Sequence, residues 1–167
     1  MLVSSKMSDV VLSTPPVSAD LQTSQELDLH LTPSTGVVIP FTTFVENSGS
    51  FAFTSSGNGT FVMPENGSYQ VTLTFSVLNS ADAKTSAPAQ VVAYMAVSGI
   101  VLVNTPMSFY INPGKTSTCV MTALVIGYAA GTEITANLEA AKDGTLLSLV
   151  SPDGESIPAN LLVTLVA

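Results

Sequence analysis

Arginine and tryptophan are absent from the 167 residues of this chain, and its four basic residues are all lysines. Charged residues make up only 10% of the sequence, and the 12 carboxylates give a formal net charge of -8. Proteins that bind nucleic acids or anionic membranes draw their affinity from clusters of Lys and Arg. Four scattered lysines cannot form such a cluster, so the composition excludes both kinds of partner.

Long hydrophobic runs and paired cysteines are also lacking. No segment approaches the ~18 consecutive apolar residues that a transmembrane helix needs. The first residues show neither the basic start nor the apolar stretch of a secretory signal. Cys119 is the single cysteine, so no disulfide can form within the chain. We therefore expect a protein that no signal peptide exports and that folds in a reducing compartment.

The shortage of charge has a structural implication, because soluble monomers usually carry ~25% charged residues. Here 46% of the residues are hydrophobic. Without a membrane span, this balance indicates that much of the surface is hidden in an oligomer. The alternative is a monomer whose surface consists mainly of Ser and Thr.

What the sequence does contain is alternation of apolar and polar residues with period two, which is typical of half-buried β-strands. Residues 68–77 are the clearest case, and Tyr69, Val71, Leu73 and Phe75 share one face of that strand. Ser98-Gly99 separates two further strands and predicts a two-residue hairpin turn. Residues 161–167 are almost continuously apolar, as in a strand buried on both faces. Many short strands of this kind predict an all-β antiparallel sandwich.

Residues 1–35 differ from the rest, since they are rich in Ser, Thr, Pro and acidic side chains. We predict that they form an extended N-terminal arm that docks on a partner, and that residues 36–167 form one domain. Within the arm, one short stretch alternates in hydrophobicity and supplies the candidates for attachment: Leu27, Leu29 and Leu31.

Residues with catalytic or metal-binding potential are isolated in the sequence. His30 is the only histidine, and no Cys or second His lies near it. Cys119 sits in an apolar run and is expected to be an inert core thiol. Asp143, Asp153 and Glu155 lie in turns and could bind calcium only if those turns converged, and no EF-hand spacing is present. We expect no enzymatic activity, no metal and no cofactor.

Several segments nevertheless form a recognisable series. Ile39-Pro40-Phe41 is followed by Gly59-Thr60-Phe61, then by a proline, and then by Gly67-Ser68-Tyr69 leading into the long strand. Residues 97–102, 124–133 and 161–165 continue the series with a hairpin, a turn and a closing strand. This series resembles the C1q/TNF-like superfamily over about residues 37–167. It is also similar to the C-terminal domains of bacterial spore-surface collagen-like glycoproteins, which belong to the same superfamily.

The resemblance implies a jelly roll of about ten strands that assembles into tight homotrimers through an apolar, aromatic inner sheet. Such a trimer would explain the shortage of charge, because interfaces are depleted in charged residues. The family binds ligands rather than transforming them, and its calcium ligands do not map onto a cluster in this chain. The candidates for the trimer interface or core are Tyr69, Val71, Leu73, Phe75 and Tyr94.

These expectations favour a structural protein of a virion: a trimer on the particle surface that decorates or cements a virus or phage capsid, or caps a fibre. Residues 1–35 would bind the capsid or fibre protein. The alternative is a C1q-type recognition module for a receptor, a glycan or another protein. A major capsid protein that packages nucleic acid would need a basic arm, and the arm holds one lysine, Lys6.

Overall fold

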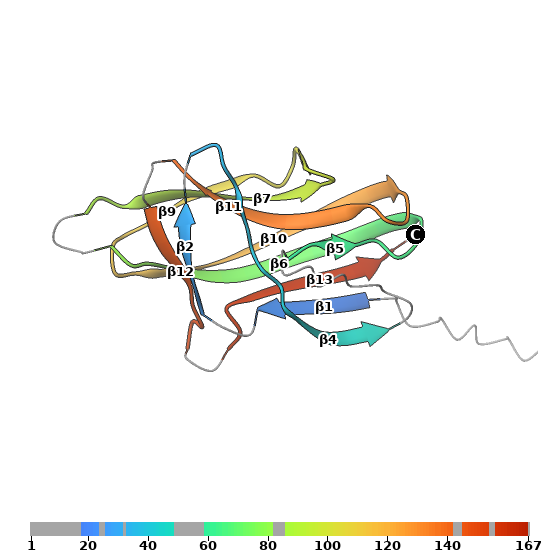
Figure 1. Cartoon of the computed structure of the whole chain (residues 1–167), viewed down its shortest axis with the longest axis horizontal. Helices are drawn as coiled ribbons and strands as arrows, with labels where there is room; N and C mark the ends of the chain where they lie inside the picture. Colours follow the sequence, from blue (N-terminus) through green and yellow to red (C-terminus); the bar gives the residue numbers. More distant parts are fainter. Residues whose placement is uncertain are drawn as a thin grey trace, which may run out of the picture.

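The structure, a computed structural model, describes residues 18–23, 26–31, 33–48, 59–81, 86–141, 145–153 and 156–166. These ranges contain thirteen strands, which pair antiparallel in two sheets (Figure 1). They contain no helix long and apolar enough to cross a membrane. The predicted all-β antiparallel sandwich is confirmed. The strand count exceeds the expected ten; three of the thirteen strands have only two residues each, and two lie in the N-terminal region.

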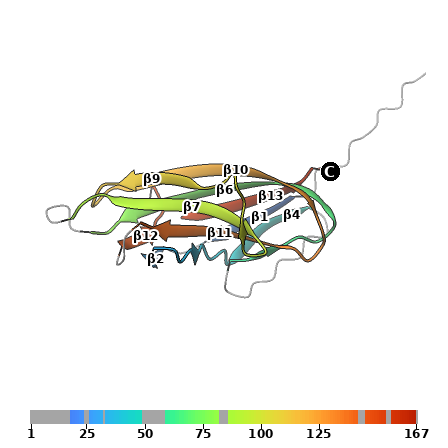
Figure 2. The ribbon, with the colours of Figure 1, turned by 90° about the horizontal axis from the view of Figure 1, so that it is seen from above.

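The two sheets differ in size. The larger sheet has seven strands: β1 (Ser18–Thr23), β2 (Leu27–Leu31), β4 (Thr43–Ser48), β6 (Gly67–Asn79), β10 (Thr116–Tyr128), β12 (Thr145–Leu149) and β13 (Ala159–Leu165). The smaller sheet has six: β3 (Val37–Val38), β5 (Phe61–Val62), β7 (Ala89–Val97), β8 (Ile100–Val101), β9 (Met107–Ile111) and β11 (Glu133–Ala140). The long strands of both sheets run along the long axis of the molecule (Figure 2).

Strand β6 is the centre of the larger sheet. Its thirteen residues span ~40 Å at the usual rise of a strand. One edge of β6 pairs with β10, and the other pairs first with β13 and then with β12. Strand β1 follows β13, and β4 follows β1. A single strand with three neighbours therefore sets the register of most of this sheet.

The core lies between the two sheets, where their inward side chains meet. The predicted alternation of β6 is confirmed, because Tyr69, Val71, Leu73 and Phe75 are at most 1% exposed. Phe75 meets Phe109 of the smaller sheet, with ring centroids 6.1 Å apart and tilted by 49°. Tilted aromatic pairs at such distances stabilise a core beyond the area they bury. This pair ties the centre of the larger sheet to β9 of the smaller one.

The N-terminal region corrects the predicted boundary at residue 35. Its described part forms β1 and β2, which pair with β13 and β12 inside the larger sheet. Ala19, Leu21, Leu29 and Leu31 are buried in the common core. The short alternation that we read as a docking feature is the inward face of strands belonging to the sandwich. Residues 1–17, the remainder of the predicted arm, lie outside the described residues.

Two tight backbone positions fix the chain around the smaller sheet. Ser98 and Gly99 have φ of 47° and 79°, the backbone of a two-residue hairpin turn, and they join β7 to β8 as predicted. Gly59 has φ of +66°, and a Cβ placed there would lie 2.0 Å from the Ile39 carbonyl oxygen. A side chain is thus excluded at residue 59, because it would overlap the backbone of another segment.

Candidate subunit-interaction surface

Strand β10 carries apolar side chains on both of its faces. Its inward residues include Cys119 and Met121, both in the core. Its outward residues Val120, Leu124 and Ile126 are 59%, 57% and 67% exposed. An antiparallel sheet with one solvated face normally presents polar side chains there. The outward residues of β10 therefore indicate a surface that another protein covers.

Neighbouring strands extend this surface in register. Thr122 of β10 lies beside Thr72 of β6, which lies beside Leu162 of β13. The two threonine hydroxyls are 3.1 Å apart and share a hydrogen bond. Leu162 is 41% exposed. We call this surface the outer face, defined by the outward side chains of β1, β6, β10 and β13: Ser18, Asp20, Gln22, Ser68, Gln70, Thr72, Thr74, Ser76, Leu78, Thr116, Thr118, Val120, Thr122, Leu124, Ile126, Asn160, Leu162 and Thr164.

The outer face carries little charge. Asp20 is the one charged residue in the set that defines it. Asn160 Nδ2 donates a hydrogen bond to Asp20 Oδ1, and Gln22 Nε2 donates one to Oδ2 at 3.2 Å. These neighbours satisfy the carboxylate within its own subunit. When the face is covered, Asp20 keeps these hydrogen-bond donors, which lower the cost of burying its carboxylate without removing it.

The position of β10 adds a free backbone edge. In the described part of the chain β10 pairs with β6 alone, along one edge, over residues 116–128. Along its other edge, no described strand pairs with its N–H and C=O groups. Long apolar edge strands promote association with other chains unless something covers them. The free edge and the outer face are both features of β10, and both indicate that another chain binds along this strand.

Of the five residues predicted for the trimer interface or the core, four lie in the core of the subunit and Tyr94 lies half-buried on the smaller sheet. Tyr69, Val71, Leu73 and Phe75 are enclosed within the subunit, so they are core residues and cannot contact a sister subunit. Tyr69 Oη donates a hydrogen bond to the Glu65 carbonyl oxygen at 2.7 Å. Burial raises the pKa of Tyr69, and the negative charge of Glu65 raises it further, although the hydrogen bond acts in the opposite direction.

Tyr94 lies on the smaller sheet, away from the outer face. Its side chain is half-buried, and a Cβ placed on Gly36 would lie 2.0 Å from the Tyr94 hydroxyl oxygen. Burial raises the pKa of Tyr94, and the charge of Glu139 adds to the increase. Gly36 therefore allows the chain before β3 to pass close to the ring, which is a structural role.

Sequence reasoning missed the residues that define the exposed apolar surface: Val120, Leu124, Ile126 and Leu162. The available signal was that residues 119–121, 123–126 and 161–163 are apolar at consecutive positions. We read residues 161–167 as a strand buried on both faces. The structure corrects this reading, because Leu161 and Val163 are buried whereas Leu162 faces outward on an uncovered sheet.

The predicted attachment residues lie in β2. Leu29 and Leu31 are 4% and 0% exposed, so they are not available to a partner, whereas Leu27 is 39% exposed. His30 is exposed on the opposite face of the strand and lies beside Leu146 of β12. These placements correct the expectation that all three leucines contact a capsid or fibre protein.

Among the described residues, no three His, Cys, Asp or Glu side chains converge in a group that could hold a metal ion. Asp153 instead holds its own turn, accepting a hydrogen bond from the Ser156 backbone N–H at 2.6 Å. Asp143 and Glu155, the other residues considered for calcium, lie outside the described residues. Burial raises the pKa of the Cys119 thiol, with a smaller opposing effect from Ser117, so the reactive thiolate is disfavoured.

Comparison with known proteins shows which known fold this structure is similar to. No family model and no curated protein matches the sequence. Many solved structures match its fold, among them a TNF protein and a complement protein domain. The TNF protein Eiger of S. frugiperda aligns over 92% of this chain and 94% of its own, with a TM-score of 0.56 and 16% identity. The globular domain of the zebrafish complement 1qA protein aligns over 90% of this chain and 98% of its own, with a TM-score of 0.53 and 10% identity. The chain therefore has the C1q/TNF-like jelly-roll fold.

Proposed function

We propose that the protein is a non-enzymatic structural module that assembles as a homotrimer through the outer face and the free edge of β10. The outer face carries this proposal, because four large apolar side chains are exposed on it and only one of its residues is charged. The C1q/TNF-like fold is often trimeric, which favours three copies over two. A closed ring of three subunits would also cover every exposed β10 edge, whereas an open chain of subunits would leave one uncovered.

The energetics of the outer face support assembly. Fully burying a Val, Leu or Ile side chain contributes about 1.5–3 kcal/mol. Val120, Leu124 and Ile126 each retain more than half of their exposure. Completing their burial would contribute roughly 1–1.5 kcal/mol for each side chain. Thr122, which lies between Val120 and Leu124, shares a hydrogen bond with Thr72 at 3.1 Å, so this hydroxyl pair can be covered without losing a partner.

Within this proposal the trimer belongs to a virion, where it decorates or cements a virus or phage capsid or caps a fibre. Residues 1–17 would attach it to the capsid or fibre protein. The arrangement of the ends supports this role. Strand β1 begins at Ser18 beside Thr164, so the N-terminal segment joins the sandwich at the end that holds the C-terminus (Figure 1). The opposite end is left to face outward.

The test compares the full chain with a variant that lacks residues 2–17. Because β1 starts at Ser18, this deletion spares both N-terminal strands, whereas a deletion to residue 35 would remove them from the core. The truncated protein should remain a trimer by light scattering and should no longer sediment with the particles that carry the full chain. Equal sedimentation of both proteins would overturn attachment through residues 1–17.

A recognition module of the C1q type is the second candidate function, and one observation favours it. The end of the sandwich farthest from the C-terminus contains an open hollow. A trimer attached through its N-termini would display three such hollows. Particle binding that depends on residues 2–17 supports the structural role, whereas binding of a soluble ligand without any particle supports the recognition role.

A further inference from the structure

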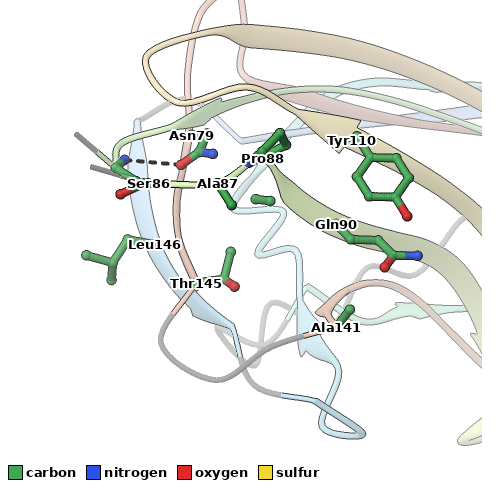
Figure 3. Close-up of a pocket in the computed structure, with 11 residues that line it drawn as sticks. Asn79, Ser86, Ala87, Pro88, Gln90, Tyr110, Ala141, Thr145 and Leu146 are labelled. Atoms are coloured by element: carbon green, nitrogen blue, oxygen red, sulfur yellow. Dashed lines mark hydrogen bonds between the residues drawn. The ribbon is translucent and has the colours of Figure 1, made fainter. Parts of the chain in front are cut away.

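The end of the sandwich opposite the C-terminus is the end where β6 finishes and β7 begins (Figure 1). A hollow of about 700 Å³ opens there, and Figure 3 shows residues that line it. The strands around it are the last part of β6, the first parts of β7 and β12, and β9. Its volume falls within the range of about 300–1,000 Å³ that small-molecule sites usually have. Side chains from both sheets contribute to its wall: Asn79, Ala81, Ser86, Ala87, Pro88, Ala89, Gln90, Tyr110, Ala141, Thr145 and Leu146.

The wall of the hollow is held in place by hydrogen bonds within the subunit. Asn79 is 1% exposed, and its Nδ2 donates to the Ile111 carbonyl oxygen at 2.9 Å. Asn79 Oδ1 accepts a hydrogen bond from the Ala81 backbone N–H at 3.1 Å (Figure 3). On the other side, the Ala141 N–H donates to the Gln90 carbonyl oxygen at 3.1 Å. The hollow is thus part of the folded subunit, because these bonds fix the segments that line it.

Tyr110 and Gln90 form the recognition pair of this hollow. They are register partners on β9 and β7, so their side chains lie next to each other on one face. Tyr110 is 68% exposed, and its ring is open to a ligand. Gln90 Nε2 donates to Ser108 Oγ at 3.2 Å, which orients the amide and leaves its Oε1 as an acceptor.

Charge is lacking among the described residues that line the hollow, since every one of them is neutral. An ionised ligand held here would lose water without gaining a counter-charge from any described residue of the lining. A purely apolar ligand would cover the Gln90 amide and the Ser86 hydroxyl without satisfying them.

We propose that this hollow binds a neutral oligosaccharide. A sugar ring has an apolar C–H face that packs on an aromatic ring, and hydroxyl groups that exchange hydrogen bonds with amides and hydroxyls. Tyr110 supplies the aromatic ring, and Gln90 and Ser86 supply the polar partners. This site does not depend on the trimer, because all of its described residues belong to one subunit.

The test uses the full chain on an array of neutral tri- to hexasaccharides, with sialylated and sulfated saccharides as a second set, followed by calorimetry on the best ligand. Binding should be confined to neutral saccharides. Tyr110→Ala and Gln90→Ala should each weaken it about tenfold, whereas Tyr110→Phe, which keeps the ring, should stay within about threefold of the parent. Asn104→Ala removes an exposed amide on the connection between β8 and β9 and should leave the affinity unchanged.

Three results would overturn the proposal: no binding to any neutral saccharide on the array, binding to the charged set alone, or equal binding by the parent, Tyr110→Ala and Gln90→Ala proteins. Light scattering on the same samples measures the oligomeric state, so saccharide binding and trimer assembly are tested separately. A monomer that binds neutral saccharides through Tyr110 would support the site and contradict the proposed assembly.

Discussion

Introducing carboxylates on the outer face should dissociate the trimer. The variant carries Val120→Asp and Leu124→Asp, which place two charges among the outward side chains of β10. Both residues are exposed in the single subunit, at 59% and 57%, so the jelly roll itself should tolerate the change. Aspartate is a poor strand former, and we expect a cost to the fold of up to about 1 kcal/mol for each substitution.

The effect on assembly is larger. Each wild-type side chain stands to contribute roughly 1–1.5 kcal/mol when a neighbouring subunit completes its burial. Two positions in three subunits amount to about 6–9 kcal/mol per trimer, which corresponds to at least about a 10⁴-fold change in the assembly constant. Desolvating the six new carboxylates adds a further cost of the same sign. At low micromolar concentration the variant should therefore be a monomer of 17.2 kDa.

Size-exclusion chromatography with light scattering is the assay, and circular dichroism checks that the β-structure persists. Ile100→Asp with Val103→Asp is the matched control, because these two apolar residues are even more exposed, at 75% and 90%, but lie at and beyond β8 of the smaller sheet. The control should remain a trimer. A trimer that survives in the outer-face variant, or one that dissociates only in the control, would refute the assignment of the interface.

Three further predictions concern the fold. Gly59→Ala should lower the unfolding free energy by about 3 kcal/mol or more, because the new Cβ overlaps the backbone and the residue is strained at positive φ. Gly99→Ala should lower it by only about 1–2 kcal/mol, because the space around Gly99 is open. Chemical denaturation of both variants measures the two differences. Cys119 should react with a thiol reagent at pH 8 far more slowly in the folded protein than in denaturant, since burial raises its pKa; equal rates would contradict the core placement. Burial also raises the pKa of Tyr69 and Tyr94, so their contribution to stability is complete below the unfolded pKa near 10 and is lost as pH rises above it. Titration at 295 nm should show part of the tyrosine absorbance change at higher pH in the folded protein than in denaturant, and identical curves would contradict the placement.

The sequence predicted the fold where local pattern and tertiary structure agree. The alternation of residues 68–77 specified β6 and its buried face, and Ser98-Gly99 specified the hairpin between β7 and β8. Both features are local, because side-chain period and turn backbone depend on adjacent residues. The N-terminal strands were missed for the complementary reason. The pairing of β1 with β13 joins residues far apart in the chain, and no local pattern specifies it.

The interaction surface could be predicted only as a property of the whole chain. The scarcity of charge indicated a hidden surface, but period two cannot show which face of a strand meets the core and which meets a partner. In β6 we assigned the inward aromatic face to both roles. In β13 the outward Leu162 was hidden in a continuous apolar run. Resolving these residues required the register of the sheet, which places Leu162 beside Thr72 and Val120 beside Thr74.

The most direct test of the proposed assembly is the mass of the unmodified chain in solution, measured by light scattering from nanomolar to micromolar concentration at low and high salt. We predict the mass of three 17.2 kDa chains. The trimer should also persist in ~1 M salt, because screening weakens charge pairs and leaves apolar contacts intact. A monomer at micromolar concentration, or a trimer that salt dissociates, would contradict an assembly held by the outer face.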